Sequence, residues 1–216
     1  METKNSIPTA SDSVNSKSIV SNAAAGLTSH SLLMTCRVLV DAPDGSSVEA
    51  IAILDSASSV SFVSERLAQS LCLPRFHQSA KISGVAGLAH NSPLQAIVNF
   101  TISATQLPNK KFPVTAVVVP QVTCDLPLHR VPFDTRWKHL SGIPLADPDF
   151  GRPGRIDILL GIDIFVEVLL HGRRIGSPDS PIAFETEFGW VLAGRTNRCV
   201  FKSFCYLTPC MCYHRR

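Results

Sequence analysis

Hydrophobic residues are dense in two stretches near the start of the patterned part of the chain, residues 32–40 and residues 48–54. Both stretches are rich in Leu, Val and Ile, and such runs favour β-strands. Between them lies the segment 41–46, which carries Asp, Pro and Gly and is typical of a turn. The pattern predicts a β-hairpin whose second strand leads directly into Asp55.

A short helix is predicted next, over residues 64–71. Ser64 is placed to cap its first turn, and Glu65 is favourable at the positive end of the helix. Pro74 follows shortly after, as is common beyond a helix end. The hairpin and the helix therefore flank Asp55 and the small residues that follow it.

Strand signals resume in residues 81–87, 94–102 and 112–119. The first stretch has glycines on both sides of a short apolar pair, the second alternates in part, and the third is dense in β-branched residues. Further apolar runs at 156–161 and 183–194 end the patterned part of the chain. Together these stretches predict an all-β fold with one or two short helices, built from hairpins.

The chain has 216 residues, enough for one good core with tails. Residues 1–29 are rich in Ser, Asn, Thr and Ala, which predicts a disordered polar leader. Residues 30–195 are predicted to form the domain. Within it, residues 120–155 are rich in Pro, Asp and His, and form either an insertion with its own packing or a functional loop. The Cys-rich segment 196–216 is expected to be disordered or a truncated tail.

The composition is that of a globular domain, with 45% hydrophobic and 17% charged residues. Lys plus Arg exceed Asp plus Glu by only 20 to 17, so no direct nucleic-acid binding is expected. No apolar stretch reaches the roughly 18 residues of a membrane-spanning helix, and the N-terminus leads into no signal core, so we expect no membrane contact and an intracellular, by default cytoplasmic, location. The dispersed histidines predict no metal site, and no cofactor is expected.

Asp55 is the sharpest candidate for chemistry. It follows an apolar strand and precedes Ser56, Ala57 and Ser58, small residues that let a backbone turn approach a ligand closely. An aspartate at the end of a buried strand costs free energy unless something uses it. The alternative interpretation is that its side chain only caps the turn, as Asp often does. Taken alone, the motif favours this second interpretation.

The order of the motifs changes that balance. An apolar strand, Asp-Ser-x-Ser, a short helix, a glycine-bearing hairpin and an apolar-apolar-Gly segment follow one another. This order resembles the retropepsin-like aspartic peptidases, and in particular the aspartic peptidase domain of Pao-type (BEL/Pao) retrotransposon polyproteins. Besides the region of Asp55, the resemblance rests on FVSERLA at 62–68, LADP at 145–148, IDILLGID at 156–163 and TEFGW at 186–190. It covers about residues 31–195.

The resemblance implies an aspartic endopeptidase in a retropepsin-like closed β-barrel, with Asp55 as the catalytic acid. In this family two carboxylates hold one water and share one proton, because like charges so close cannot both ionise easily. One carboxyl polarises the scissile carbonyl, and the other takes a proton from the attacking water. Since the chain has one such motif, the second Asp55 would come from another copy in a homodimer. The implied substrate is an extended peptide, within a retrotransposon polyprotein.

The resemblance also implies supporting roles for other residues. Ser56 would hydrogen-bond across the dimer and hold the two active-site turns together. A glycine-bearing hairpin would act as a flap over the substrate, although it could equally be an ordinary hairpin tip. The supporting set is Ser56, Ala57, Ser58, Leu159, Leu160 and Gly161, and the flap set is Gly84, Val85, Ala86 and Gly87.

Two departures from the family pattern keep a second function open. Family members usually carry Gly where this chain has Ala57, and the added methyl group lies where the turn must approach substrate. An Asp–Arg ion pair that is frequent in retropepsins is replaced by Ser59 and Ile162, so no lone buried charge is left behind. The alternative function is therefore a catalytically inactive module of the same fold that binds peptides or mediates dimerisation.

Overall fold

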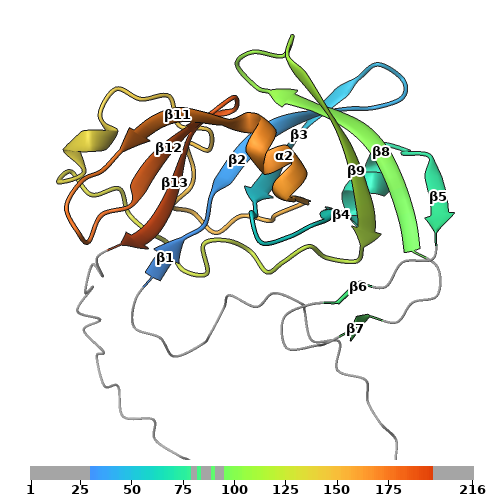
Figure 1. Cartoon of the computed structure of the whole chain (residues 1–216), viewed down its shortest axis with the longest axis horizontal. Coiled ribbons are helices and arrows are strands. Elements are labelled where there is room, and N and C mark those ends of the chain that lie inside the picture. The colour runs from blue at the N-terminus through green and yellow to red at the C-terminus, as the bar shows by residue number, and fades with distance from the viewer. Residues whose placement is uncertain (1–29, 79–81, 84–88, 91–94, 197–216) are drawn as a thin grey trace, which may run out of the picture.

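The structure is a computed structural model that describes residues 30–78, 82–83, 89–90 and 95–196 (Figure 1). The strands are β1 (His30–Leu32), β2 (Thr35–Asp41), β3 (Ser47–Leu54), β4 (Ser61–Ser64), β5 (Arg75–Gln78), β6 (Ile82–Ser83), β7 (Ala89–His90), β8 (Gln95–Ala104), β9 (Lys111–Val119), β10 (Ile158–Leu160), β11 (Leu169–Arg174), β12 (Ile182–Thr186) and β13 (Gly189–Thr196). The helices are α1 (Glu65–Ser70), α2 (Ile162–Val168) and the 3-10 turn η2 (Lys138–Leu140). Strands dominate the described residues.

Six strands close into a barrel in the order β2-β3-β10-β4-β9-β8, and the pairing of β8 with β2 completes the ring. Alternate residues of β2, Cys36, Val38 and Val40, are fully buried, as expected for a strand with one face on the core. They pack in one cluster with Ile102 of β8 and Ile158 of β10. The closed barrel with only short helices confirms the predicted all-β fold class with a closed barrel.

Strand β10 brings a distant part of the chain beside Asp55. It lies between β3, to which it runs parallel, and β4, to which it runs antiparallel. Leu160, the last residue of β10, lies opposite Leu54, the last residue of β3. Because the two strands are parallel and in this register, Gly161 and Asp55 leave the barrel at the same end.

Helix α1 begins where the sequence predicts it. The side chain of Ser64 accepts a hydrogen bond from the backbone N–H of Leu67 at 3.2 Å, so the predicted cap is confirmed. Leu67 and Ala68 are buried in the barrel cluster. The backbone N–H of Ser64 donates to the carbonyl of Asp157 at 2.8 Å, which fastens the start of α1 to the residue before β10.

A second sheet of four strands, in the order β1-β13-β12-β11, stands beside the barrel (Figure 1). Residues 120–155 are mostly irregular in backbone, yet they contribute Trp137, Leu140 and Phe150 to a buried cluster that includes Ala183 of β12. An aromatic pair, Trp137 and Phe150, has ring centroids 6.4 Å apart in this cluster. These residues therefore pack against the second sheet as an ordered part of the fold.

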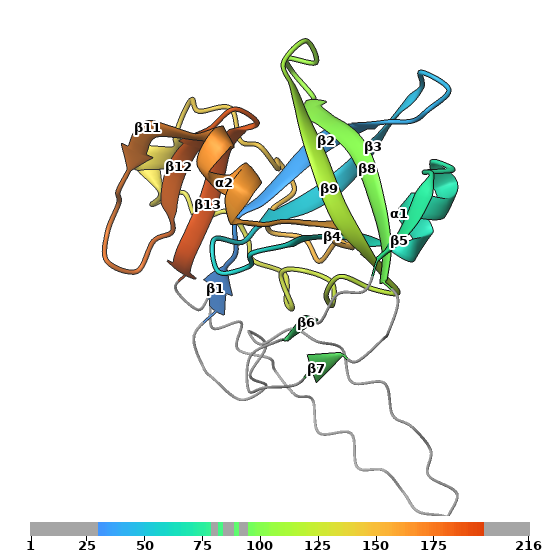
Figure 2. The same ribbon diagram turned by 45° about the vertical axis from the view of Figure 1, so that its right-hand side comes forward.

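The strands β6 and β7 pair antiparallel, with Ile82 opposite His90. In both views the pair lies apart from the barrel strands (Figure 1, Figure 2). The predicted flap residues 84–87 connect these strands and lie outside the described residues. The predicted leader 1–29 and the tail 196–216, except Thr196, also lie outside them.

Candidate active site

Asp55 stands in a tight turn directly after β3 and is partly buried. Its backbone N–H donates to the carbonyl of Leu160 at 2.9 Å, and its own carbonyl accepts from the N–H of Ser58 at 3.3 Å. One carboxylate oxygen, Oδ1, accepts the N–H of Ala57 at 2.9 Å. The other oxygen, Oδ2, has no hydrogen-bond partner in the described part of the chain. The turn therefore fixes the carboxylate through one oxygen and leaves the second one available.

The turn after Asp55 rests on Gly161, and we call residues 55–60 the active-site loop. The carbonyl of Ser58 accepts the N–H of Ile162 at 2.8 Å, and the N–H of Gly161 donates to the buried hydroxyl of Ser61 at 3.0 Å. A Cβ at position 161 would lie 3.0 Å from the carbonyl oxygen of Ser58 and 3.1 Å from the carbonyl carbon of Val60. Glycine is needed here for close approach of two backbones.

The predicted supporting residues are thus partly brought together. Leu159 and Leu160 lie in β10 beside β3, and Gly161 contacts the active-site loop. Ser56 and Ala57 are exposed at the outside of the loop. The predicted hydrogen bond of Ser56 to a second copy stays a prediction, as does the flap role of residues 84–87.

Asp157, the residue directly before β10, is a second carboxylate close to the strand that supports Asp55. It is 4% exposed, and its Oδ1 accepts the hydroxyl of Ser64 at 2.7 Å while its Oδ2 accepts from Arg66. An aspartate directly before the apolar strand β10 indicates a buried polar partner. The run itself could not identify Arg66, which lies 91 residues away in sequence. Both oxygens are engaged, so this carboxylate positions α1 against β10.

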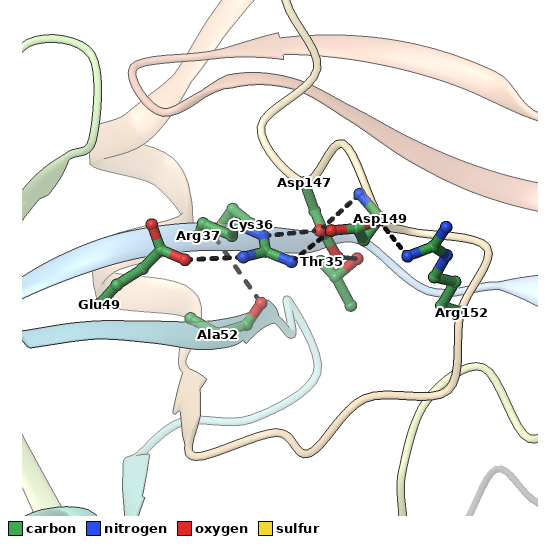
Figure 3. A network of polar contacts seen from close by, with 8 residues as sticks. All are labelled: Thr35, Cys36, Arg37, Glu49, Ala52, Asp147, Asp149 and Arg152. Carbon is green, nitrogen blue, oxygen red and sulfur yellow. Dashed lines mark hydrogen bonds and ion pairs between the residues drawn. The ribbon is translucent and has the colours of Figure 1, made fainter.

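A second paired carboxylate, Asp147, belongs to the LADP motif (Figure 3). It accepts the hydroxyl of Thr35 and the Nε–H of Arg37, each at 3.1 Å. Arg37 also donates to Glu49 at 2.7 Å and to Asp149 at 2.9 Å. Partial burial lowers the pKa of Arg37, but the hydrogen bonds to Glu49 and Asp147 outweigh it and raise that pKa. The network fastens the end of the 120–155 segment to β2.

No group of three or more His, Cys, Asp or Glu side chains lies close enough together in the described residues to hold a metal ion. No described helix has the length and apolar character needed to cross a membrane.

Comparison with known proteins gives structural similarities only, since no family model and no curated protein matches the chain. The chain is similar to the crystal structure of the retroviral protease-like domain of Ddi1 from Leishmania major, with 11% identity and a TM-score of 0.34, over 74% of this chain and 94% of that one. It is also similar to a retropepsin-like aspartic protease from Rickettsia conorii, with 11% identity and a TM-score of 0.32, over 79% of this chain and 98% of that one. These similarities concern the fold alone.

Proposed function

We propose that this chain is an aspartic endopeptidase in which Asp55 from two copies activates a water molecule. The main support for this proposal is the hydrogen bonding of the Asp55 carboxylate, which differs between its two oxygens. Its Oδ1 is held by the N–H of Ala57, while its Oδ2 has no partner among the described residues. The backbone of the same residue is tied to Leu160 at 2.9 Å, so the free oxygen sits on a fixed support.

A single carboxylate cannot perform both proton transfers that peptide hydrolysis needs. One carboxyl must be protonated to polarise the scissile carbonyl, and another must be ionised to take the proton from water. The buried acids Asp147 and Asp157 are already saturated by hydrogen bonds and ion pairs. We therefore assign the second carboxylate to Asp55 of another copy, related by a two-fold axis.

The surroundings of Asp55 favour such an approach of two copies. Ser56 and Ala57, the next two residues, are exposed, so a second active-site loop can reach them. In this proposal the hydroxyl of Ser56 bonds to the facing loop and keeps the two carboxylates coplanar. Ser58 is occupied within its own loop, where its hydroxyl donates to the carbonyl of Val60 at 2.6 Å.

The substrate in this proposal is an extended peptide, held in strand fashion between the paired loops and a flap formed by residues 84–87. Support comes from β6 and β7, which flank these residues and pair as a hairpin. By the resemblance of the motifs, the natural task is processing of a Pao-type retrotransposon polyprotein. The chemistry needs no cofactor, because protein carboxylates and water supply every proton transfer.

The direct test is cleavage of a mixed peptide library by the full chain, from about pH 3 to pH 8. We expect cleavage that is favoured in acid, is blocked by a statine-type transition-state mimic and is abolished by Asp55→Asn. The matched control is Asp44→Asn, which neutralises an exposed aspartate in the turn before β3, at the other end of the strand from Asp55, and should leave cleavage intact. Equal activity of the wild type and Asp55→Asn would reject the assignment.

An inactive peptide-binding or dimerisation module is the alternative, and Ala57 is the observation that favours it. Ala57 is exposed and lies two residues beyond Asp55, which substrate would have to approach. Ala57→Gly separates the two functions. A peptidase hindered by the methyl group should cleave faster with Gly, whereas a module without activity should gain none and should still bind peptides.

A further inference from the structure

A cavity lies where the turn between β8 and β9 meets the turn between β12 and β13. The ring centroids of Phe112 and Phe188 are 5.5 Å apart at this contact, and Lys110 forms an ion pair with Glu187. Figure 1 shows both turns at the upper edge of the molecule. The cavity has a volume of about 230 Å³, and none of the described residues that line it belongs to the active-site loop. It is therefore a separate site from the one around Asp55.

The size and the walls of the cavity suit a single long side chain. Pockets that enclose whole small molecules usually measure about 300–1,000 Å³, so this one is smaller. Its apolar wall is formed by Leu107 of the β8–β9 turn, Pro144, Leu170 of β11 and Trp190 of β13. Leu107 is 67% exposed, so part of this wall is open to solvent. An apolar wall of this kind stabilises a chain of methylene groups.

Glu185 of β12 supplies a carboxylate to the cavity. Its side chain is partly buried and lies across β11, over Gly172. A Cβ at position 172 would lie 2.3 Å from the Oε2 and 2.7 Å from the Cβ of Glu185, so only glycine leaves room for this side chain. The carboxylate forms no hydrogen bond or ion pair with any residue that the structure describes. Because a partly buried carboxylate is stabilised by a partner, a cation that enters the cavity is bound favourably.

Two cations near the cavity are already engaged with other groups. Lys110 pairs with Glu187, and the guanidinium of Arg174 lies 5.4 Å from the centre of the Trp190 ring. Neither of them forms an ion pair with Glu185, and no described residue that lines the cavity is cationic. The negative charge of Glu185 is therefore left for a ligand.

We propose that this cavity binds the lysine or arginine side chain of a peptide segment. The methylene stem packs against Leu170 and Trp190, and the cationic head pairs with the carboxylate of Glu185. Exposed Leu107 contacts apolar residues next to the bound side chain. Charge complementarity selects this occupant, because an apolar side chain would cover Glu185 and leave its charge without a partner. The site goes beyond the proposed function, since it holds a polypeptide away from Asp55 and does not depend on catalysis.

The test is a nuclear magnetic resonance titration of the full chain carrying Asp55→Asn, so that no peptidase activity can consume the probe. The probe is a glycine peptide, blocked at both ends, with one central lysine; a second peptide has norleucine there, and a third has arginine. We expect the lysine or the arginine peptide to shift the indole N–H signal of Trp190 and to leave that of Trp137, which does not line the cavity, in place. The norleucine peptide should bind about tenfold more weakly or less, because it lacks the charged head.

Glu185→Gln keeps the shape of this side chain and removes its charge. The fold should tolerate the change, since the carboxylate has no partner among the described residues. We expect the preference for a cationic peptide over the norleucine peptide to disappear. The matched control is Glu167→Gln, an exposed glutamate on α2 that does not line the cavity, and it should bind the peptides as the parent chain does.

Four results would overturn the proposal. They are an unshifted Trp190 signal with both cationic peptides, equal binding of the cationic and norleucine peptides, undiminished binding by Glu185→Gln, and an equal loss of binding in Glu167→Gln. All of these readouts measure binding in a chain without the Asp55 carboxylate. A failure of the peptidase assignment therefore leaves the cavity proposal standing, and a failure of the cavity proposal leaves the peptidase assignment standing.

Discussion

Asp147→Ala probes how the 120–155 segment is held to the barrel. Asp147 is 6% exposed and joins this segment to β2 through the hydroxyl of Thr35 and the guanidinium of Arg37 (Figure 3). Truncation removes both acceptors together. Arg37 keeps Glu49 and Asp149 as partners, so it is not left as an uncompensated charge.

The expected loss of stability is estimated from the two groups that lose Asp147 as their acceptor, Thr35 and Arg37. Thr35 is 9% exposed, and an unpaired buried hydroxyl costs about 1–3 kcal/mol. The lost charge-assisted bond from Arg37, whose side chain is 27% exposed, adds about 1 kcal/mol after allowance for solvent screening. We therefore expect a loss of about 3 kcal/mol in the free energy of unfolding. The control Asp149→Ala removes a half-exposed acceptor of the same arginine and should cost less than about 1 kcal/mol.

Urea unfolding followed by tryptophan fluorescence is the suitable assay. The only two tryptophans of the chain, Trp137 and Trp190, both belong to the cluster between the 120–155 segment and the second sheet. Fluorescence therefore reports on this cluster, while far-UV circular dichroism reports on the strands as a whole. If Asp147→Ala cost no more than Asp149→Ala, the anchoring role of the buried carboxylate would be refuted.

Three further changes test other parts of the structure. Gly161→Ala should destabilise the fold by about 1–2 kcal/mol and slow cleavage, since a methyl group would lie 3.0 Å from a backbone oxygen of the active-site loop; urea unfolding and kcat measure the two effects. Burial raises the pKa of the Cys36 thiol, so N-ethylmaleimide should label exposed Cys72 before Cys36, as peptide mass spectrometry can show. A hydrogen bond from Lys111 lowers the pKa of Asp41 in the folded chain. The stability that this interaction adds is therefore present above the unfolded pKa of about 3.9, and it is lost as the pH falls through the lower pKa of the folded chain. Lys111→Gln should cost about 0.5 kcal/mol at neutral pH and nothing near pH 2, by unfolding at both; a pH-independent difference would contradict the linkage.

Local patterns predicted the elements around Asp55 well. Runs of β-branched residues identified the hairpin of β2 and β3, and Ser64 marked the start of α1 through its own cap. Both predictions succeed because strand periodicity and helix capping depend on residues that are close together in sequence. The predicted strand over residues 32–40 is divided in the structure, since β1 ends at Leu32 and pairs with β13 in the other sheet.

Strand pairing between segments that are distant in sequence could not be predicted from these local patterns. The insertion of β10 between β3 and β4 depends on contacts between segments about one hundred residues apart. The partners of the buried acids are equally remote, since Thr35 and Asp147 are separated by 112 residues. Residues 120–155 have broken apolar patterning because their few large side chains serve one cluster from an irregular backbone. The packing of these side chains could therefore be determined only from the structure.

Asp55 differs from the two buried aspartates in how completely its carboxylate is hydrogen-bonded. Asp147 and Asp157 are almost fully buried, and both oxygens of each accept hydrogen bonds. Such complete pairing is what a buried charge needs merely to be tolerated. Asp55 is less buried and keeps one oxygen without a partner in the described chain, although its backbone is fixed by β10. A carboxylate that is held in place through one oxygen and leaves the other unpaired is what the proposed two-copy mechanism requires of Asp55.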